Sequence, residues 1–235
     1  MTVAGGLLLL VATQWPGDQQ IPPVRYPDLP HHTATLTAFV PKGWKLTDKG
    51  VGDLNGDHIP DAALAIWMDD PRNRIDPSYD AKTRYDTNPM MLVVVFGSKA
   101  GGYDLALANH KLIPRRENPN QDPPFNGVSI ANGVLHVKMH EFLEAGGWWL
   151  GKMSFAFRWQ DGALRLIGYD RDGIIKNTGA TDVASVDYPA RRMIEKTGTM
   201  SGDAPDQTKT VALPSKPLLT IDQVGDGLMF DPDEH

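Results

Sequence analysis

Acidic and amide side chains stand at every second position of one short stretch, Asp53-Leu-Asn-Gly-Asp-His-Ile-Pro-Asp61. In calcium-binding loops the side chains at positions 1, 3 and 5, the backbone carbonyl at position 7 and a later carboxylate converge on one ion, because calcium prefers several oxygen ligands. The spacing therefore predicts a calcium site with the ligands Asp53, Asn55, Asp57, the Ile59 carbonyl and Asp61.

Two positions distinguish this loop from an EF-hand. Position 6, which usually needs Gly because the backbone takes a positive φ, is His58, and His tolerates that region better than most residues. Position 12 is Leu64, inside an apolar run, so the loop should lead into a strand. With few ligands, one of them neutral, we expect weak binding suited to about millimolar extracellular calcium. The alternative is a metal-free turn whose side chains cap their own backbone.

Two other loops have a composition suited to contacting a partner. Ser98-Lys-Ala-Gly-Gly-Tyr103 is either a plain hairpin turn or a narrow tip that enters a cleft, with Ser98 and Tyr103 as polar ends and Gly101 and Gly102 as small residues. Gly146-Gly-Trp-Trp149 places two indoles on opposite sides of an extended chain. Either one Trp packs into the core while the other covers a neighbouring strand, or Trp148 and Trp149 anchor a protein or a sugar.

Catalytic motifs are weak, and we expect no enzyme. His136 and His140 lie in an alternating segment typical of a strand, where four residues span roughly 13 Å, too far to share one ion. Glu141 and Glu144 could be proposed as a glycosidase pair, but a solvated strand end explains them more simply. The sequence contains no Gly-x-Ser-x-Gly, no phosphate-binding Gly loop and no Cys nucleophile.

Charge and composition limit the kinds of partner and compartment that fit this sequence. The net charge of -6 and the lack of a basic run argue against nucleic acid. Without Cys there is neither a disulfide nor a thiolate metal site. Residues 1–13 include an apolar stretch that is too short to span a bilayer but fits a signal-peptide core, truncated before its basic region; the alternative is a buried strand.

The remaining chain is predicted to be a Pro-rich linker, residues 14–33, followed by a single β domain, residues 34–235, with a polar C-terminal tail. Residues 68–89 and 114–126 are expected as long surface loops, and residues 198–214 are polar and rich in Gly, Thr and Asp. Asn132-Gly133 and Asp161-Gly162 are strong hairpin signals. The fold class is all-β and antiparallel, an irregular propeller-like or sandwich arrangement of about ten short strands. The expected strands are Ala34–Val40, Ala62–Trp67, Met90–Gly97, Tyr103–Ala108, Gly127–Ile130, Val134–His140, Lys152–Trp159, Ala163–Tyr169, Asp182–Asp187, Arg192–Thr197 and Leu218–Asp222.

Four segments together carry a resemblance to a known group: Gly52–Asp61, Gly101–Ala106, Gly146–Trp149 and Leu166–Asp170. They resemble bacterial cell-envelope proteins that bear calcium, have a propeller-like β fold, and are related to inhibitors of invertebrate-type lysozyme. Some members resemble immunity proteins against peptidoglycan-hydrolase toxins delivered by type IV secretion. The resemblance spans roughly residues 39–197, and its specific part is the calcium loop.

The resemblance implies a periplasmic or secreted calcium-binding inhibitor whose partner is a peptidoglycan hydrolase or lysozyme-like toxin. The inhibitory loop of such inhibitors, a Ser-Gly-containing turn with a Tyr, matches loosely at Ser98, Gly101, Gly102 and Tyr103. The immunity lipoproteins of the group carry a lipobox Cys that has no counterpart here, which leaves membrane anchoring open. The alternative function is a carbohydrate- or cell-wall-binding β module that uses Trp148 and Trp149.

Overall fold

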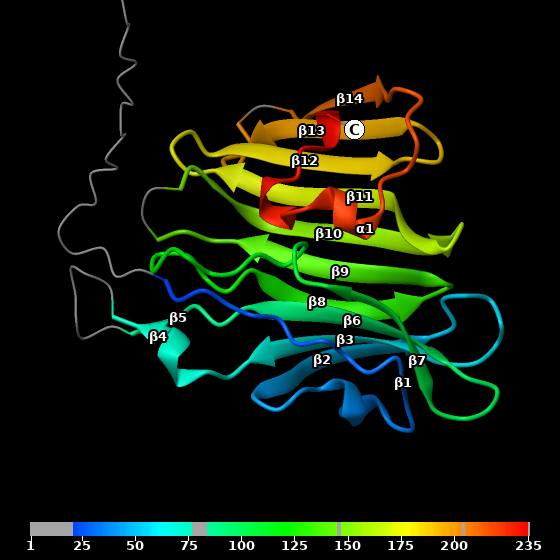
Figure 1. Ribbon diagram of the computed structural model, residues 1–235. Coiled ribbons are helices and arrows are strands. Elements are labelled where there is room, and N and C mark those ends of the chain that lie inside the picture. Colours follow the sequence, from blue (N-terminus) through cyan, green and yellow to red (C-terminus); the bar gives the residue numbers. More distant parts are fainter. Residues whose placement is uncertain (1–20, 77–83, 145–146, 204, 235) are drawn as a thin grey trace, which may run out of the picture.

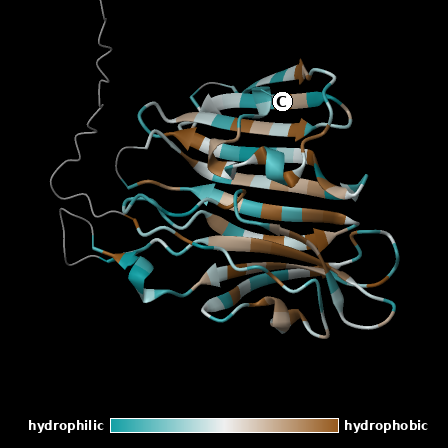
Figure 2. Cartoon of the chain, viewed as in Figure 1, coloured by the Kyte–Doolittle hydropathy of each residue, from teal (hydrophilic) through white to brown (hydrophobic). Residues whose placement is uncertain are grey.

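The computed structural model describes residues 21–76, 84–144, 147–203 and 205–234, and it is an antiparallel all-β protein with two main sheets (Figure 1). The predicted fold class is confirmed, in a sandwich-like form whose sheets are not closed into a barrel. Within the described residues there are 14 strands, several of them only two residues long. Bands of hydrophobic and hydrophilic residues alternate along many of the strands (Figure 2).

The first sheet has five strands in the order β1-β7-β6-β3-β2. Its strand β3 is buried on both faces: Ala63 and Ala65 belong to one hydrophobic cluster, whereas Leu64 and Ile66 belong to a second. This double burial explains the unbroken apolar run that follows the predicted calcium loop. The strands are β1 (His32–Thr33), β2 (Trp44–Gly52), β3 (Asp61–Met68), β6 (Met90–Gly97) and β7 (Tyr103–Asn109).

The second sheet has seven strands that follow one another in chain order as a meander. Both predicted hairpin dipeptides are confirmed, with φ values of 52° and 72° at Asn132 and Gly133 and of 51° and 71° at Asp161 and Gly162. Such left-handed turns match the twist of paired strands. The strands are β8 (Phe125–Ala131), β9 (Val134–Glu141), β10 (Trp149–Gln160), β11 (Ala163–Ile175), β12 (Ala180–Asp187), β13 (Arg192–Thr199) and β14 (Gln207–Ala212).

The two sheets meet where β2 and β3 lie against β8. Gly50 permits this approach, because a Cβ built there would lie 2.8 Å from the Cα of Ser129. Next to it, the Val128 amide donates a hydrogen bond of 2.9 Å to the Asp48 carboxylate. The main hydrophobic cluster is shared by the sheets and includes Leu92 and Val94 from the first and Val137, Phe155, Phe157 and Leu166 from the second.

The C-terminal segment lies across the core-facing side of the second sheet and runs through α1 (Ile221–Val224), η3 (Gly227–Met229) and η4 (Pro232–Glu234) (Figure 1). Ile221 and Val224 are buried in the main cluster. The ring of Phe230 lies 5.5 Å from that of Phe155 and 5.1 Å from that of Tyr169. The tail is therefore part of the core, although its sequence is polar.

Residues 21–31 and 34–43 cover the other face of the first sheet, whereas His32 and Thr33, which were expected in the linker, join the sheet as β1. Tyr26 and Leu29 pack against the second hydrophobic cluster, and the Tyr26 ring stacks on His110 with 4.1 Å between ring centroids. Arg115 donates a hydrogen bond of 2.7 Å to the Pro22 carbonyl. Residues 21–33, expected to form the second part of a linker, thus lie against the sheet or within it. The signal-like segment and residues 14–20 lie outside the described residues.

Two expected strands are wrong. Ala34–Val40 contains a 3-10 helix, η1 (Leu36–Phe39), because Leu36 and Phe39 are spaced to turn one helical face towards the second cluster. Leu218–Asp222 contains the start of α1, since Thr220 and Gln223 form a capping box that starts a helix. Within residues 218–222, only Thr220 makes a β-type contact, an isolated bridge to Arg165.

Strands β2 and β14 were not expected, and both are rich in polar residues. The segment 68–89, expected as a loop, also contains short elements: η2 (Pro71–Asn73), β4 (Arg74–Ile75) and β5 (Tyr85–Asp86). Residues 77–83 lie outside the described residues.

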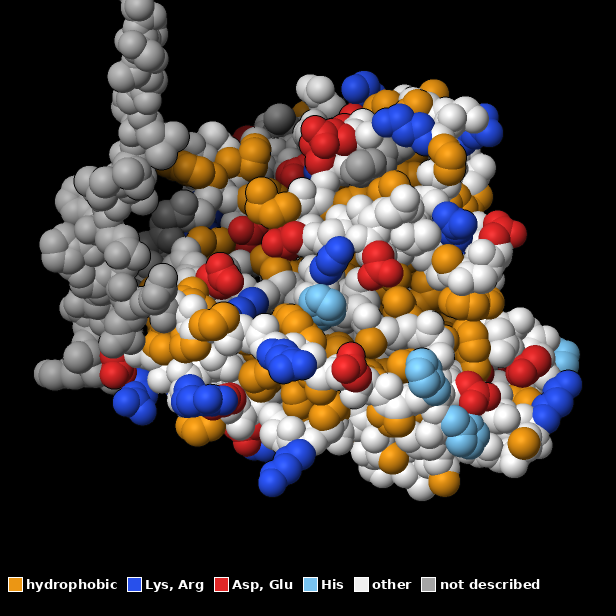
Figure 3. All heavy atoms as spheres, in the orientation of Figure 1, with side chains coloured by type: hydrophobic (Ala, Val, Ile, Leu, Met, Phe, Trp, Pro, Cys, Tyr) orange, Lys and Arg blue, Asp and Glu red, His pale blue; other side chains and the backbone are white. Residues whose placement is uncertain are grey.

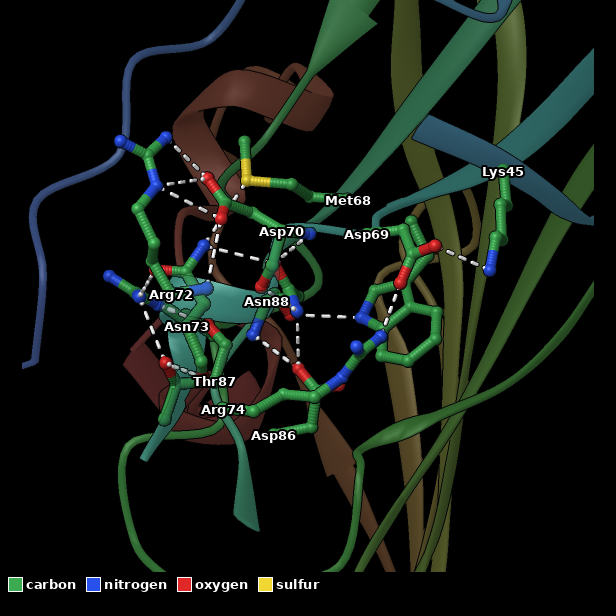
Figure 4. Close-up of polar contacts among 12 residues, drawn as sticks. Lys45, Met68, Asp69, Asp70, Arg72, Asn73, Arg74, Asp86, Thr87 and Asn88 are labelled. Carbon is green, nitrogen blue, oxygen red and sulfur yellow. Dashed lines mark hydrogen bonds and ion pairs between the residues drawn. The ribbon is translucent and has the colours of Figure 1, made fainter. Parts of the chain in front are cut away.

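A cluster of polar side chains connects residues 69–74 to residues 86–88 (Figure 4). Asn88 is central: its side chain accepts a hydrogen bond of 2.9 Å from Asn73 and donates one of 2.7 Å to Asp86. Arg74 donates to Asp86 at 3.0 Å and also pairs with Asp69. Because Asn73 and Asn88 are almost fully buried, these bonds satisfy groups that are costly to leave unpaired.

Candidate functional site

The predicted calcium loop connects β2 to β3 and is closed by its own side chains. The Asp53 carboxylate accepts hydrogen bonds from the amides of Gly56 at 2.7 Å and His58 at 2.9 Å. Asn55 Oδ1 accepts from the Asp57 amide at 2.9 Å, and Asp57 Oδ1 accepts from the Ile59 amide at 2.8 Å. These are the backbone caps expected for Asp and Asn in turns. They hold the side chains of Asp53, Asn55 and Asp57 against the backbone of the loop.

His58 adopts a φ of 65°, which confirms that position 6 of the loop takes the left-handed conformation. Its imidazole is almost fully exposed, with Nδ1 3.5 Å from Asp53 Oδ2. Although desolvation alone would raise it, the hydrogen bonds from Gly56 and His58 hold the pKa of Asp53 below its ordinary value. Asp53 is thus ionised across the neutral range, as a metal ligand must be.

Asp61, the first residue of β3, is fully buried. Its Oδ2 accepts the amides of Leu54 at 2.7 Å and Asn55 at 3.3 Å, and its Oδ1 accepts the Gly97 amide at 2.9 Å. Burial raises the pKa of Asp61, these hydrogen bonds lower it in part, and the charge of Asp57 raises it further. Among the described residues, no cationic side chain pairs with Asp61.

The donor set fits a hard cation. An ionised carboxylate has about four lone-pair sites, so each of these Asp residues can accept amides and still ligate. A buried carboxylate without a counter-charge is costly, and a cation bound in the loop would neutralise it. Within the described residues, no three His, Cys, Asp or Glu side chains gather closely enough to hold a metal by themselves. Calcium would therefore depend on the Asn55 amide and the Ile59 carbonyl as well.

The predicted partner-binding turn joins β6 to β7. Two backbone hydrogen bonds close it, from the Ser98 amide to the Gly102 carbonyl at 3.1 Å and from the Gly101 amide to the Ser98 carbonyl at 2.9 Å. Gly101 and Gly102 have φ values of 91° and 78°. The exposed tip consists of Lys99, Ala100 and Gly101.

The flanks of this turn are packed. A Cβ on Gly102 would lie 2.4 Å from the Thr33 carbonyl oxygen, so Gly102 lets β1 approach. Tyr103 pairs with Thr33 and packs against the second hydrophobic cluster. Tyr103 therefore supports the base of the turn, and Lys99 is the polar side chain at its tip. Lys99 was not among the predicted contact residues.

The calcium loop and the turn lie together at one end of the molecule, the right-hand end in Figure 1. The β8–β9 hairpin is near them, since a Cβ on Gly133 would lie 3.7 Å from the Asp53 carbonyl. Acidic, basic and His side chains are close to one another at this end (Figure 3). Trp149 is far from the calcium loop. Strand β9 starts with Val134 beside this hairpin and ends roughly 20 Å away at Glu141. Glu141 pairs with Gly151, two residues from Trp149.

The two tryptophans differ in exposure. Trp149 packs against the main cluster, and its indole N–H donates a hydrogen bond of 3.1 Å to Asp182. Its ring fills the space that a Cβ on Gly173 would occupy. Trp148 is 66% exposed. The prediction that one indole packs into the core is confirmed for Trp149, whereas Trp148 stays in solvent instead of covering a neighbouring strand.

Glu141 lines a surface hollow whose walls also include Arg115, Glu117, Asp226 and Met229. Burial raises the pKa of Glu141, and the charge of Asp226 raises it further. Glu141, the last residue of β9, is thus close enough to Asp226 of the tail to be repelled by its charge, whereas Glu144, three residues beyond the strand, is exposed. The sequence could not have shown that Glu141 and Asp226 lie close together, because 85 residues separate the two carboxylates.

His136 and His140 both lie on β9, as predicted, where they pair with Ala156 and Lys152 of β10. They occupy the sheet face opposite the core, since the intervening Val137 and Met139 are buried. Their strand geometry excludes a shared metal ion.

Comparisons with family models, with curated proteins and with solved structures found no match. In the described part of the chain, no helix is long and apolar enough to cross a membrane.

Proposed function

We propose that this protein is a calcium-binding inhibitor, of the immunity-protein kind, that blocks a peptidoglycan hydrolase or lysozyme-like toxin in the periplasm or outside the cell. The proposal depends on the resemblance of its loop segments to such inhibitors. Its main structural support is the narrow, exposed tip Lys99-Ala-Gly101 beside the candidate calcium loop.

The turn is suited in size and charge to a glycosidase cleft. Many glycoside hydrolases cut with two carboxylates that face each other across the scissile bond, about 5–9.5 Å apart. A tip with one ammonium group and small neighbours can enter such a cleft, where Lys99 would pair with a catalytic carboxylate. The two closing hydrogen bonds and the packed flanks preorganise the turn, which lowers the entropy cost of binding.

Calcium has a structural role in this proposal. It would neutralise the acidic loop, including the buried Asp61, and hold the loop against the base of the turn. Extracellular calcium is high enough to saturate a site of weak affinity.

A lysis assay tests the inhibitor function. The protein is added to a panel of peptidoglycan hydrolases acting on cell-wall suspensions, and the fall in turbidity is followed. We expect block of at least one enzyme, and Lys99→Ala should weaken inhibition by about 30-fold, equivalent to about 2 kcal/mol for a hot spot. Lys42→Ala, which changes another exposed lysine in a different loop, is the matched control. Failure to inhibit any hydrolase would contradict the proposal.

The exposed Trp148 favours one alternative, a carbohydrate-binding module. Trp149 bonds to Asp182 and packs against the main hydrophobic cluster, so only the ring of Trp148 is free to stack on a sugar. A sugar-binding protein should be retained on insoluble peptidoglycan, and Trp148→Ala should abolish retention, whereas Lys99→Ala should not.

A further inference from the structure

The candidate calcium loop and the partner-binding turn share one buried residue. Asp61 receives two amides from the loop, those of Leu54 and Asn55, through Oδ2. It receives the amide of Gly97, the residue before the turn, through Oδ1. One carboxylate thus connects two segments that are 36 positions apart in the chain.

The contact between these segments is also tight sterically. A Cβ on Gly97 would lie 2.5 Å from Ile59 Cγ2 and 2.6 Å from the Pro60 carbonyl oxygen. The end of β6 therefore rests on residues 59 and 60 of the loop, and a shift of these residues has to move Gly97.

Gly97 in turn sets the start of the turn. The next residue, Ser98, makes both closing hydrogen bonds, to Gly102 and from Gly101. On the far side of the turn, Gly102 is held against Thr33 and His32. Because that side is fixed by β1, movement of Gly97 changes the shape of the exposed tip.

We propose that Asp61 is a positioning residue that couples the loop to the turn, so that metal occupancy of residues 53–61 orders the tip formed by Lys99, Ala100 and Gly101. Partner binding is then calcium-dependent, and by reciprocity the partner tightens calcium binding by the same factor. The partner and the metal are those of the proposed function, whereas the coupling itself depends on the contacts of Asp61 and Gly97.

Hydrogen–deuterium exchange of the full chain tests the coupling without any partner. Calcium chloride should slow exchange about 5-fold or more in two peptides, one covering the loop and one covering residues 97–102. The turn at residues 176–179, at the opposite end of the second sheet where Ile175 pairs with Trp149, should not change. In Asp53→Ala, which removes the caps on Gly56 and His58 but does not touch the turn, exchange at residues 97–102 should rise even without calcium.

Asp61→Asn keeps the size and one acceptor oxygen of the side chain, and it should reduce the effect of calcium at residues 97–102 more than at the loop. If this variant does not fold, Asp53→Ala alone decides. Two results together would overturn the coupling: calcium slows exchange at the wild-type loop but not at residues 97–102, and Asp53→Ala leaves exchange at residues 97–102 unchanged. No calcium effect at the loop would overturn metal control and the calcium part of the proposed function. Failure to inhibit hydrolases in the lysis assay would overturn the inhibitor function. It would not affect the coupling between the loop and the turn, which the exchange experiment measures separately.

Discussion

The Asp48 carboxylate on β2 accepts a hydrogen bond of 2.9 Å from the Val128 amide on β8, and so joins the two sheets at the point where Gly50 lets them touch. Its other oxygen accepts the Lys49 amide at 2.8 Å. Asp48 lies at an irregularity in the pairing of β2 with β3, which turns the side chain out of the ladder and towards the neighbouring sheet.

We predict that Asp48→Ala destabilises the protein by about 1–2 kcal/mol, because the Val128 amide loses its acceptor at a partly buried interface. Equilibrium unfolding in urea measures this value. Asp172→Ala removes an exposed carboxylate from the centre of the second sheet and should change stability by less than about 0.5 kcal/mol. Equal effects of the two substitutions would show that the contact between Asp48 and Val128 contributes little.

Strand β2 also shows where sequence reasoning reaches its limit. The strands β3 and β6 are continuous apolar runs and were predicted, because double burial leaves an unmistakable pattern. In β2 the exposed residues include Lys45, Thr47 and Lys49, and the apolar alternation is lost. Burial by a distant segment, such as that of Phe230 against Phe155, cannot be inferred from local periodicity either.

The same contrast holds at the candidate site. The ligand spacing and the positive φ at His58 follow from the local sequence. The contact of Asp61 with Gly97 does not, because it depends on the pairing of β3 with β6. The local conformation of the loop was therefore predictable, and the contact between the two loops was not.

Calcium should raise the thermal stability of the wild type, and Asp57→Ala should remove this effect. The ligands are separated in the unfolded chain, so metal binding favours the folded state. At calcium ten times the dissociation constant the gain is about 1.4 kcal/mol. Melting curves with excess calcium and with a chelator provide the comparison, and Asp172→Ala should respond like the wild type. Identical melting temperatures of the wild type in both solutions would argue against a metal in the loop.

Glu141→Gln should raise the melting temperature at pH 7. Burial, together with the charge of Asp226, raises the pKa of Glu141 in the folded state, so the ionised form is less favourable there than in the unfolded chain. Stability is therefore lost as pH rises from the ordinary value of 4.5 through the raised pKa. The advantage of Gln should shrink as pH falls below 4.5, where the wild-type carboxyl is protonated in both states. A gain that is independent of pH would point to packing instead of charge, and Glu144→Gln is the exposed control.

Substitutions of Trp149 and Trp148 should have different effects on the free energy of unfolding. Trp149→Phe keeps an aromatic ring but loses the hydrogen bond to Asp182, at a cost of about 1 kcal/mol. Trp149→Ala also empties the space above Gly151 and Gly173 and should cost about 3 kcal/mol. Trp148→Ala should stay within about 0.5 kcal/mol of the wild type. A large loss of stability in Trp148→Ala would show that its ring packs against the protein and would weaken the sugar-binding alternative.

The N-terminal segment provides the last prediction, because residues 21–33 were expected as a linker but lie against the first sheet or within it. A chain that begins at His31 lacks Tyr26 and Leu29, which pack on the second hydrophobic cluster, and lacks the Pro22 carbonyl bound by Arg115. Burying one large apolar side chain contributes about 1.5–3 kcal/mol, so the loss should be at least about 2 kcal/mol. A chain that begins at Ile21 keeps all these contacts and is the matched control. Urea unfolding of the two shortened proteins gives the difference directly. If they are equally stable, the packing of Tyr26 and Leu29 does not contribute to folding, and residues 21–30 act as a linker despite their contacts.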